Sequence, residues 1–132
     1  MLGCTLIDLP AALGLSGYAT AWLKALIFTW AVEVGLGVWL LRAEAALPRR
    51  LVLLFVASAV THPCVWFVFP FIGLDYVPAI ILAEIFAVVV EATIYWAGIS
   101  SLLARRALAV SFVLNGASLG LGLLVRELWG WV

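Results

Sequence analysis

Four long apolar stretches, separated by short segments with charges and prolines, constrain the fold of this chain more than any other feature. They cover about residues 19–41, 51–69, 79–99 and 107–125. Each has roughly the 20 residues that an α-helix needs to cross the hydrocarbon core of a bilayer. Leu and Ala dominate, and strict alternation is missing, which argues against a transmembrane β-barrel. We therefore predict an all-α integral membrane protein, a four-transmembrane-helix bundle that forms a single domain over residues 1–132.

The composition supports lipid as the solvent. Hydrophobic residues make up 67% of the 132 positions and charged residues only 11%, whereas a soluble domain is about half apolar and a quarter charged. A soluble fold of this length could not bury so much apolar surface. The net charge is zero, so nothing indicates a nucleic-acid partner or a basic patch for the membrane surface.

The arginines predict the orientation in the membrane. The segments Arg42–Arg50 and Ser100–Arg106 carry most of them and fall on the same side of a four-span chain. The positive-inside rule makes that side cytoplasmic. Both termini and Asp75 are then on the outer side, where Lys24 and Arg126 are exceptions. We expect the inner (plasma) membrane of the cell as the location.

Residues 1–18 are expected to form a short interfacial segment that leads into the first span. Asp8 and Pro10 interrupt their apolar run and no basic region precedes it, so a cleavable signal peptide is not expected. No hydrophobic region precedes Cys4 either, so we do not expect its lipidation. Cys64 falls about 21 Å into the second span, and a disulfide between it and Cys4 is not expected.

Each predicted span carries one ionisable or amide side chain near its centre. Such groups are costly in lipid and usually face a partner, a cavity or a pathway. At 1.5 Å per residue from the nearest cytoplasmic arginine, they lie roughly 14–21 Å deep, within one central band. We therefore predict that the four groups converge. A fifth group, Glu84, lies one heptad before Glu91 on the third span. The predicted polar site is Glu33, His62, Glu84, Glu91 and Asn115.

Hydroxyl and small residues share helical faces with these groups, as interhelical hydrogen bonds and close packing require. We expect five of them to support the polar site: Ser58, Thr61, Tyr95, Ser111 and Ser118. A transport path through a single copy of four helices would be cramped. We therefore expect a homo-oligomer, a dimer or a larger membrane complex, with Gly35/Gly37 and Ser118/Gly122 as the contact faces.

The chemistry of the polar site leaves several functions open. Carboxylates, an imidazole and an amide can bind a divalent metal such as Zn, Mn or Fe, with His62, Glu84 and Glu91 as the expected ligands. The same groups can hold protons or a monovalent cation. The sequence contains no HExxH pair, phosphate-binding glycine loop or Gly-x-Ser-x-Gly motif. No catalytic residue can therefore be assigned.

We favour a transporter or channel-like protein in which this midplane site handles a metal ion, a proton or a small cation. One alternative is an intramembrane, metal-assisted enzyme, hydrolase- or protease-like, in which Glu84 or Glu91 acts as general base beside His62. The other alternative is a structural or assembly subunit whose polar groups pair with the helix of a partner.

Overall fold

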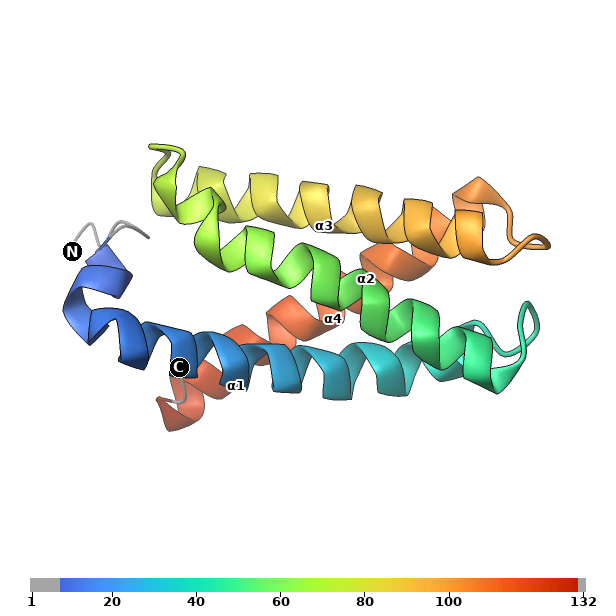
Figure 1. The fold of residues 1–132 in the computed structure, drawn as a ribbon, viewed down its shortest axis with the longest axis horizontal. Helices are drawn as coiled ribbons and strands as arrows, with labels where there is room; N and C mark the ends of the chain where they lie inside the picture. Colours follow the sequence, from blue (N-terminus) through green and yellow to red (C-terminus); the bar gives the residue numbers. More distant parts are fainter. Residues whose placement is uncertain (1–7, 131–132) are drawn as a thin grey trace.

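The computed structural model describes residues 8–130, which form a bundle of four α-helices (Figure 1). These helices are α1 (Asp8–Leu40), α2 (Leu47–Phe67), α3 (Tyr76–Gly98) and α4 (Ala104–Trp129), and a short 3-10 helix, η1 (Phe69–Phe71), follows α2. All four α-helices are long and apolar enough to span a membrane. The prediction of an all-α four-helix bundle is confirmed.

The first helix differs most from the expected boundaries. It begins at Asp8, within the segment expected to be interfacial, and the interfacial position of this segment remains a prediction. The helix is interrupted at Gly14, whose φ of 70° and ψ of 162° are readily adopted only by glycine. The part suited to crossing a membrane runs from Ser16 to Leu40. Cys4 and the rest of residues 1–7 lie outside the described residues.

The other helix ends follow from local sequence. Pro48 lies in the first turn of α2, where its missing N–H costs nothing. Gly73, with a φ of 78°, lies in the connection between η1 and α3, and Gly130, with a φ of 60°, ends α4. The helices α2 and α4 begin before the predicted spans because Arg49 and Arg105 are themselves helical. Charges mark the edge of the apolar stretch and not the first helical turn.

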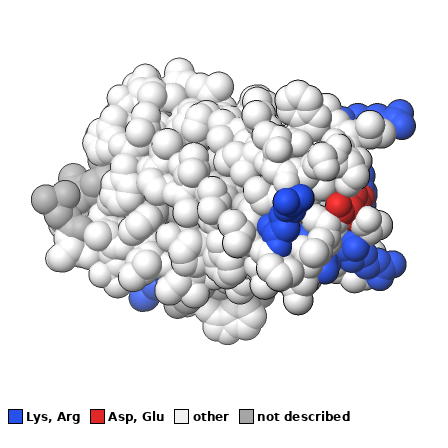
Figure 2. All heavy atoms as spheres, turned by 45° about the vertical axis from the view of Figure 1, so that its right-hand side comes forward, with Lys and Arg blue, Asp and Glu red and all other residues white. Residues whose placement is uncertain are grey.

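The helices form a ring in which each packs against the next along the chain, and α4 closes the ring against α1. Both termini lie at one end of the bundle, which we call the terminal end (Figure 1). The α1–α2 and α3–α4 connections lie at the opposite end, the arginine end. Figure 2 shows Lys and Arg side chains gathered there beside a broad uncharged surface. The predicted grouping of the arginine-bearing loops is confirmed, and the side of the membrane remains a prediction.

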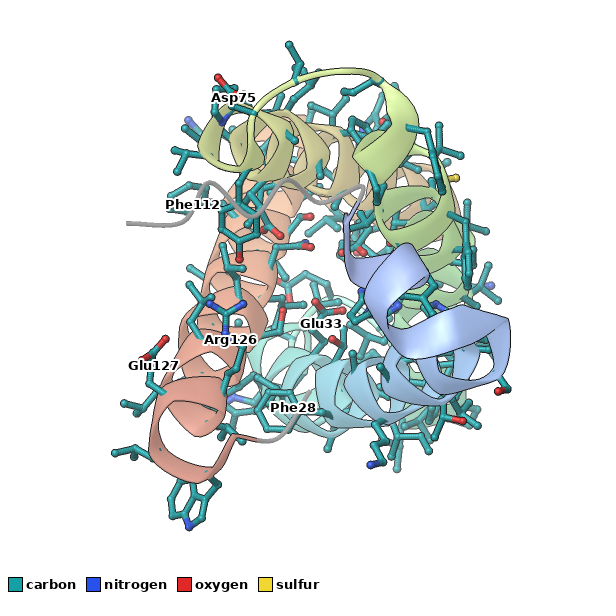
Figure 3. All side chains as sticks on the ribbon, turned by 90° about the vertical axis from the view of Figure 1, so that its left-hand side faces the viewer. Phe28, Glu33, Asp75, Phe112, Arg126 and Glu127 are labelled. Carbon is teal, nitrogen blue, oxygen red and sulfur yellow. The ribbon has the colours of Figure 1, made fainter. Side chains whose placement is uncertain are left out.

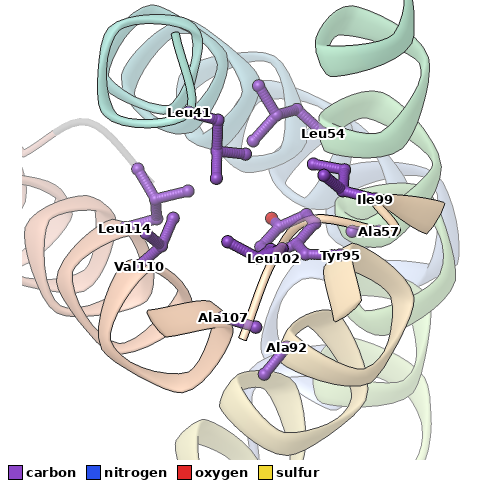
Figure 4. Close-up of a cluster of buried hydrophobic side chains, with 10 residues drawn as sticks. All are labelled: Leu41, Leu54, Ala57, Ala92, Tyr95, Ile99, Leu102, Ala107, Val110 and Leu114. Atoms are coloured by element: carbon purple, nitrogen blue, oxygen red, sulfur yellow. The ribbon is translucent and has the colours of Figure 1, made fainter. Parts of the chain in front are cut away.

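An apolar cluster fills the bundle interior toward the arginine end (Figure 4). The helices α2, α3 and α4 and both connections at this end contribute to it, and its members are almost fully buried. The cluster consists of Leu41, Leu54, Ala57, Ala92, Tyr95, Ile99, Leu102, Ala107, Val110 and Leu114. The interior at the arginine end is therefore occupied by buried apolar side chains.

Arginine side chains also join the segments at this end. Arg106 Nε lies 3.3 Å from Glu44 Oε1, and its Nη2 donates to the Leu40 carbonyl at 2.9 Å. Arg50 donates to the Val38 carbonyl. The α1–α2 connection is thereby tied to α4, and the start of α2 is tied to α1.

The expected contact faces for an oligomer are mostly inside the bundle. A Cβ on Gly37 would approach the Leu54 side chain to 2.4 Å, and one on Gly122 would lie 3.8 Å from Phe28. Ser118 donates a hydrogen bond to Glu33 within the bundle. The predicted role of these three residues in oligomer contact is therefore wrong, because they pack helices of the same chain. Gly35 is exposed, and the oligomeric state itself remains a prediction.

Leu54→Ala should lower the free energy of unfolding by about 2–5 kcal/mol, the range for removing a fully buried leucine side chain. Leu54 has no exposed surface in the apolar cluster. Unfolding of the purified protein by denaturant in mixed micelles measures the change. Val52→Ala is the matched control, because Val52 lies on the same helix and is 60% exposed. An equal loss in both variants would contradict the assigned packing of α2.

Candidate functional site

A partly open cavity of about 610 Å³ lies in the centre of the bundle. It extends from the middle of the helices to the terminal end, where Phe69, Tyr76 and Arg126 line it. Beyond its deepest residues the apolar cluster fills the interior. Figure 3 views the bundle from the terminal end and shows Glu33 in the interior between the helices. The cavity is therefore blind toward the arginine end.

All five residues of the predicted polar site line this cavity. They come from all four helices and are separated by up to 82 positions in the sequence (Glu33 to Asn115). The prediction that these polar groups converge is confirmed. Whether they carry out a function remains a prediction.

Glu33 on α1 is held by hydroxyl groups from two other helices. Ser58 Oγ on α2 donates to Glu33 Oε2 at 2.5 Å, and Ser118 Oγ on α4 donates to Oε1 at 2.9 Å. The side chain is only 1% exposed. Each carboxyl oxygen therefore has its own donor, and the three helices are joined at this level.

Glu91 on α3 is held in the same way. Thr61 Oγ1 on α2 donates to Glu91 Oε1 at 2.7 Å, and Asn115 Nδ2 on α4 donates to Oε2 at 2.7 Å. Tyr95 OH, one turn further along α3, is 3.4 Å from the same Oε2. The Asn115 amide is in turn 3.0 Å from the Ser111 carbonyl oxygen. Glu91 thus joins α3 to the two helices that also hold Glu33.

His62 on α2 combines burial with an unsatisfied ring nitrogen. Its side chain stacks on Trp66, with ring centroids 6.0 Å apart, and its Nε2 lies 3.5 Å from Thr29 Oγ1. The residue is 9% exposed. Its Nδ1 is buried and has no hydrogen-bond partner among the described residues. The ring of His62 lines the cavity, yet one of its polar atoms stays buried without a partner in residues 8–130, which is uncommon in folded proteins.

Glu84 is the carboxyl group without a partner. It lies two turns from Glu91 on α3 and lines the cavity nearer its terminal end. Among the side chains that the structure describes, that of Glu84 forms no hydrogen bond and no ion pair, in contrast to Glu33 and Glu91. The carboxyl group of Glu84 is therefore free to interact with whatever occupies the cavity.

The five predicted supporting residues all lie in or beside the network. Ser58, Thr61, Tyr95 and Ser118 contact the two bonded carboxyl groups directly. Ser111 does not line the cavity, but it is fully buried and its Oγ lies 3.3 Å from Asn115 Nδ2. It orients the amide that holds Glu91.

Residues from the terminal end complete the cavity and were not predicted as part of the site. Tyr18 OH donates to the Trp66 carbonyl at 2.5 Å, and Arg126 Nη1 donates to Tyr76 OH at 3.2 Å. Thr29 is one turn from Glu33, and this spacing could have identified it. No sequence signal identified the others, because Trp and Arg near a helix end are typical of interfacial anchors.

The structure does not bring together a ready metal site. Within the described residues, no three His, Cys, Asp or Glu side chains lie close enough to one another to hold a metal ion. His62, Glu84 and Glu91 nevertheless line the same cavity. Binding of Zn, Mn or Fe by these three residues remains a prediction. Cys64 is a free thiol that lies 3.6 Å from the Val60 carbonyl oxygen.

Architecture and site define the class to which this chain belongs. It is a bundle of four helices long and apolar enough to span a membrane, with a buried network of Glu and His side chains. No protein-family model, curated protein or solved structure matches it. The function has to be inferred from the cavity and its residues.

Proposed function

We propose that the cavity is a cation site of a transporter-like membrane protein, where protons and a small cation compete for the same carboxyl groups. One observation carries this proposal. Three carboxyl groups, those of Glu33, Glu84 and Glu91, line one cavity, and none of them pairs with a Lys or Arg within residues 8–130. Glu33 and Glu91 are 1% exposed and Glu84 is half-buried, and a charged group inside a membrane-spanning bundle needs a counter-ion. Each carboxyl group therefore either carries a proton or has a cation beside it.

The surroundings of the carboxyl groups favour exchange between these two states. Ser and Thr hydroxyls donate to Glu33 and Glu91, and hydroxyl groups can reverse to accept a proton from a neutral acid. The network thus satisfies either protonation state without a change of fold. Glu84, with no internal partner, offers the place where a cation can bind first. Arg126 lies at the terminal end of the cavity, where Tyr76 accepts its hydrogen bond.

The blind end of the cavity favours a transporter over an open channel. The apolar cluster fills the interior beyond Glu33 and Glu91, so a cation reaching the carboxyl groups would need a rearrangement to leave at the arginine end. Contacts such as Arg106 with Glu44 would have to break in that step. Alternating access around a midplane site is the usual mechanism of secondary transporters.

The two other functions receive less support. The expected intramembrane enzyme would use Glu84 or Glu91 as general base beside His62, whereas no hydrogen bond joins His62 to either carboxyl group among the described residues. A structural subunit would pair its polar groups with a partner's helix, whereas Glu33 and Glu91 already have donors in their own chain. A free Glu84 is also unexpected for a purely structural network.

Proton release on cation addition tests the proposal. Protein in nanodiscs, in weakly buffered solution, is titrated with Na⁺, Zn²⁺ and ethylammonium in turn, and the pH change is recorded. We expect release by the wild type with at least one cation. We expect none with that cation when Glu33, Glu84 and Glu91 are all replaced by Gln.

Asp75→Asn is the matched control, since it also removes a carboxylate but lies exposed at the terminal end. It should release protons as the wild type does. Absence of release from the wild type with all three cations between about pH 5 and 9 would overturn the proposal.

A further inference from the structure

A second concave feature adjoins the cavity on the outside of the bundle. It is an apolar groove of about 360 Å³ between α3 and α4. Exposed side chains form its walls, among them Ile81 at 55%, Ile85 at 56% and Phe112 at 69%. Gly116 contributes no side chain, and a Cβ there would meet nothing within 4 Å. In a membrane this groove faces the lipid chains.

The groove and the central cavity are neighbours that share part of their lining. Three residues line both features, namely Ile80, Glu84 and Leu119. Among the described residues that line the groove, Glu84 is the only ionisable one. A carboxyl group without an internal partner thus stands where a lipid-facing apolar groove meets a polar interior.

We propose that the cation of this site is the head group of an amphiphile, which enters from the membrane between α3 and α4 and keeps its alkyl chain in the groove. This inference rests on the proposed function and specifies its substrate class. The ligand is an ammonium ion with one alkyl chain. Its positive charge complements Glu84, and its chain complements the apolar walls of the groove.

The size of the central cavity supports an organic head group. A volume of about 610 Å³ is within the range of small-molecule sites and far exceeds the space that a single metal ion fills. Aromatic side chains such as Tyr18, Trp66 and Phe69 line its terminal half, and aromatic faces attract organic cations.

The chain-length dependence of binding distinguishes this substrate class from a simple cation. Gly116→Leu places a side chain in the groove without touching a carboxyl group. Half-maximal proton release is measured in nanodiscs with ethylammonium and with decylammonium. We expect the substitution to raise the half-maximal concentration of decylammonium about tenfold or more, since each lost methylene contact is worth about fourfold. The value for ethylammonium should change less than twofold.

Gly120→Leu is the matched control. Gly120 lies one turn further along α4, has equally open space around a Cβ and does not line the groove. It should leave both values unchanged. If Gly116→Leu does not fold, Val88→Phe narrows the groove from α3 and should give the same result.

An unchanged decylammonium value in the folded groove variant would overturn the amphiphile inference while leaving the cation site intact. The amphiphile inference would also be overturned if the wild type released protons with neither ethylammonium nor decylammonium. Retained release with Na⁺ or Zn²⁺ would then show that the proposed function survives. Loss of release with every cation would show that the proposed function itself has failed.

Discussion

Replacing Glu84 with glutamine should weaken cation binding by about 30-fold or more and leave the thermal stability of the protein unchanged. Removing one partner of a buried charge pair typically costs 2 kcal/mol or more, which corresponds to about 30-fold in affinity. Glu84 forms no hydrogen bond or ion pair in the described part of the chain, so the amide loses no internal contact. The half-maximal cation concentration for proton release and the Tm in the absence of cation measure the two effects.

Two variants make the Glu84 result specific. Glu84→Asp keeps the charge on a shorter side chain and should recover part of the affinity. Asp75→Asn removes an exposed carboxylate and should bind like the wild type. Equal affinity in Glu84→Gln and the wild type would show that the free carboxyl group is not where the cation binds. A large drop in Tm would instead indicate a structural role.

Asn115→Leu should destabilise the protein by about 1–3 kcal/mol, and adding Glu91→Leu should recover part of that loss. In the single variant Glu91 Oε2 loses its 2.7 Å donor and keeps only Tyr95 OH at 3.4 Å. An unsatisfied buried acceptor carries this cost, whereas replacing both partners by apolar groups can be nearly neutral. Unfolding of the two single variants and the double variant in mixed micelles measures the coupling.

The other hydrogen bonds of Thr61 and Asn115 explain why the two single variants are expected to lose different amounts of stability. Without Glu91, Thr61 still donates to the Ala57 carbonyl at 3.2 Å and Asn115 still donates to the Ser111 carbonyl at 3.0 Å. Glu91→Leu alone should therefore cost less than Asn115→Leu alone. Thr93→Val, which removes an exposed hydroxyl from α3, is the control and should have little effect. A double variant that shows the full sum of the two losses would contradict a direct bond between Glu91 and Asn115.

The site was partly predictable because helical geometry converts sequence distance into depth. Counting from the arginines put Glu33, His62, Glu91 and Asn115 in one band, and all four line the central cavity. The same counting could not pair donors with acceptors. The bonds from Ser118 to Glu33 and from Asn115 to Glu91 depend on the rotation of each helix about its axis, which hydropathy does not specify when every face is apolar.

Small residues show the same limit. Gly37, Ser118 and Gly122 are small residues of the kind expected on an oligomer contact face. In the structure they pack helices within the bundle. A small residue permits close approach of any helix, from the same chain or from another. Only the arrangement of the four helices decides which neighbour occupies that space.

Chain composition by itself determined the fold class. Four apolar stretches of membrane-spanning length must satisfy their backbone groups internally, and helices do so within each stretch. The tertiary structure alone decided that Glu33 and Glu91 are bonded while Glu84 is free, and that the cavity ends at an apolar cluster. These differences arise from contacts between residues 24 to 85 positions apart on different helices, since side-chain partners across a bundle depend on packing angles and rotations that local sequence leaves undetermined.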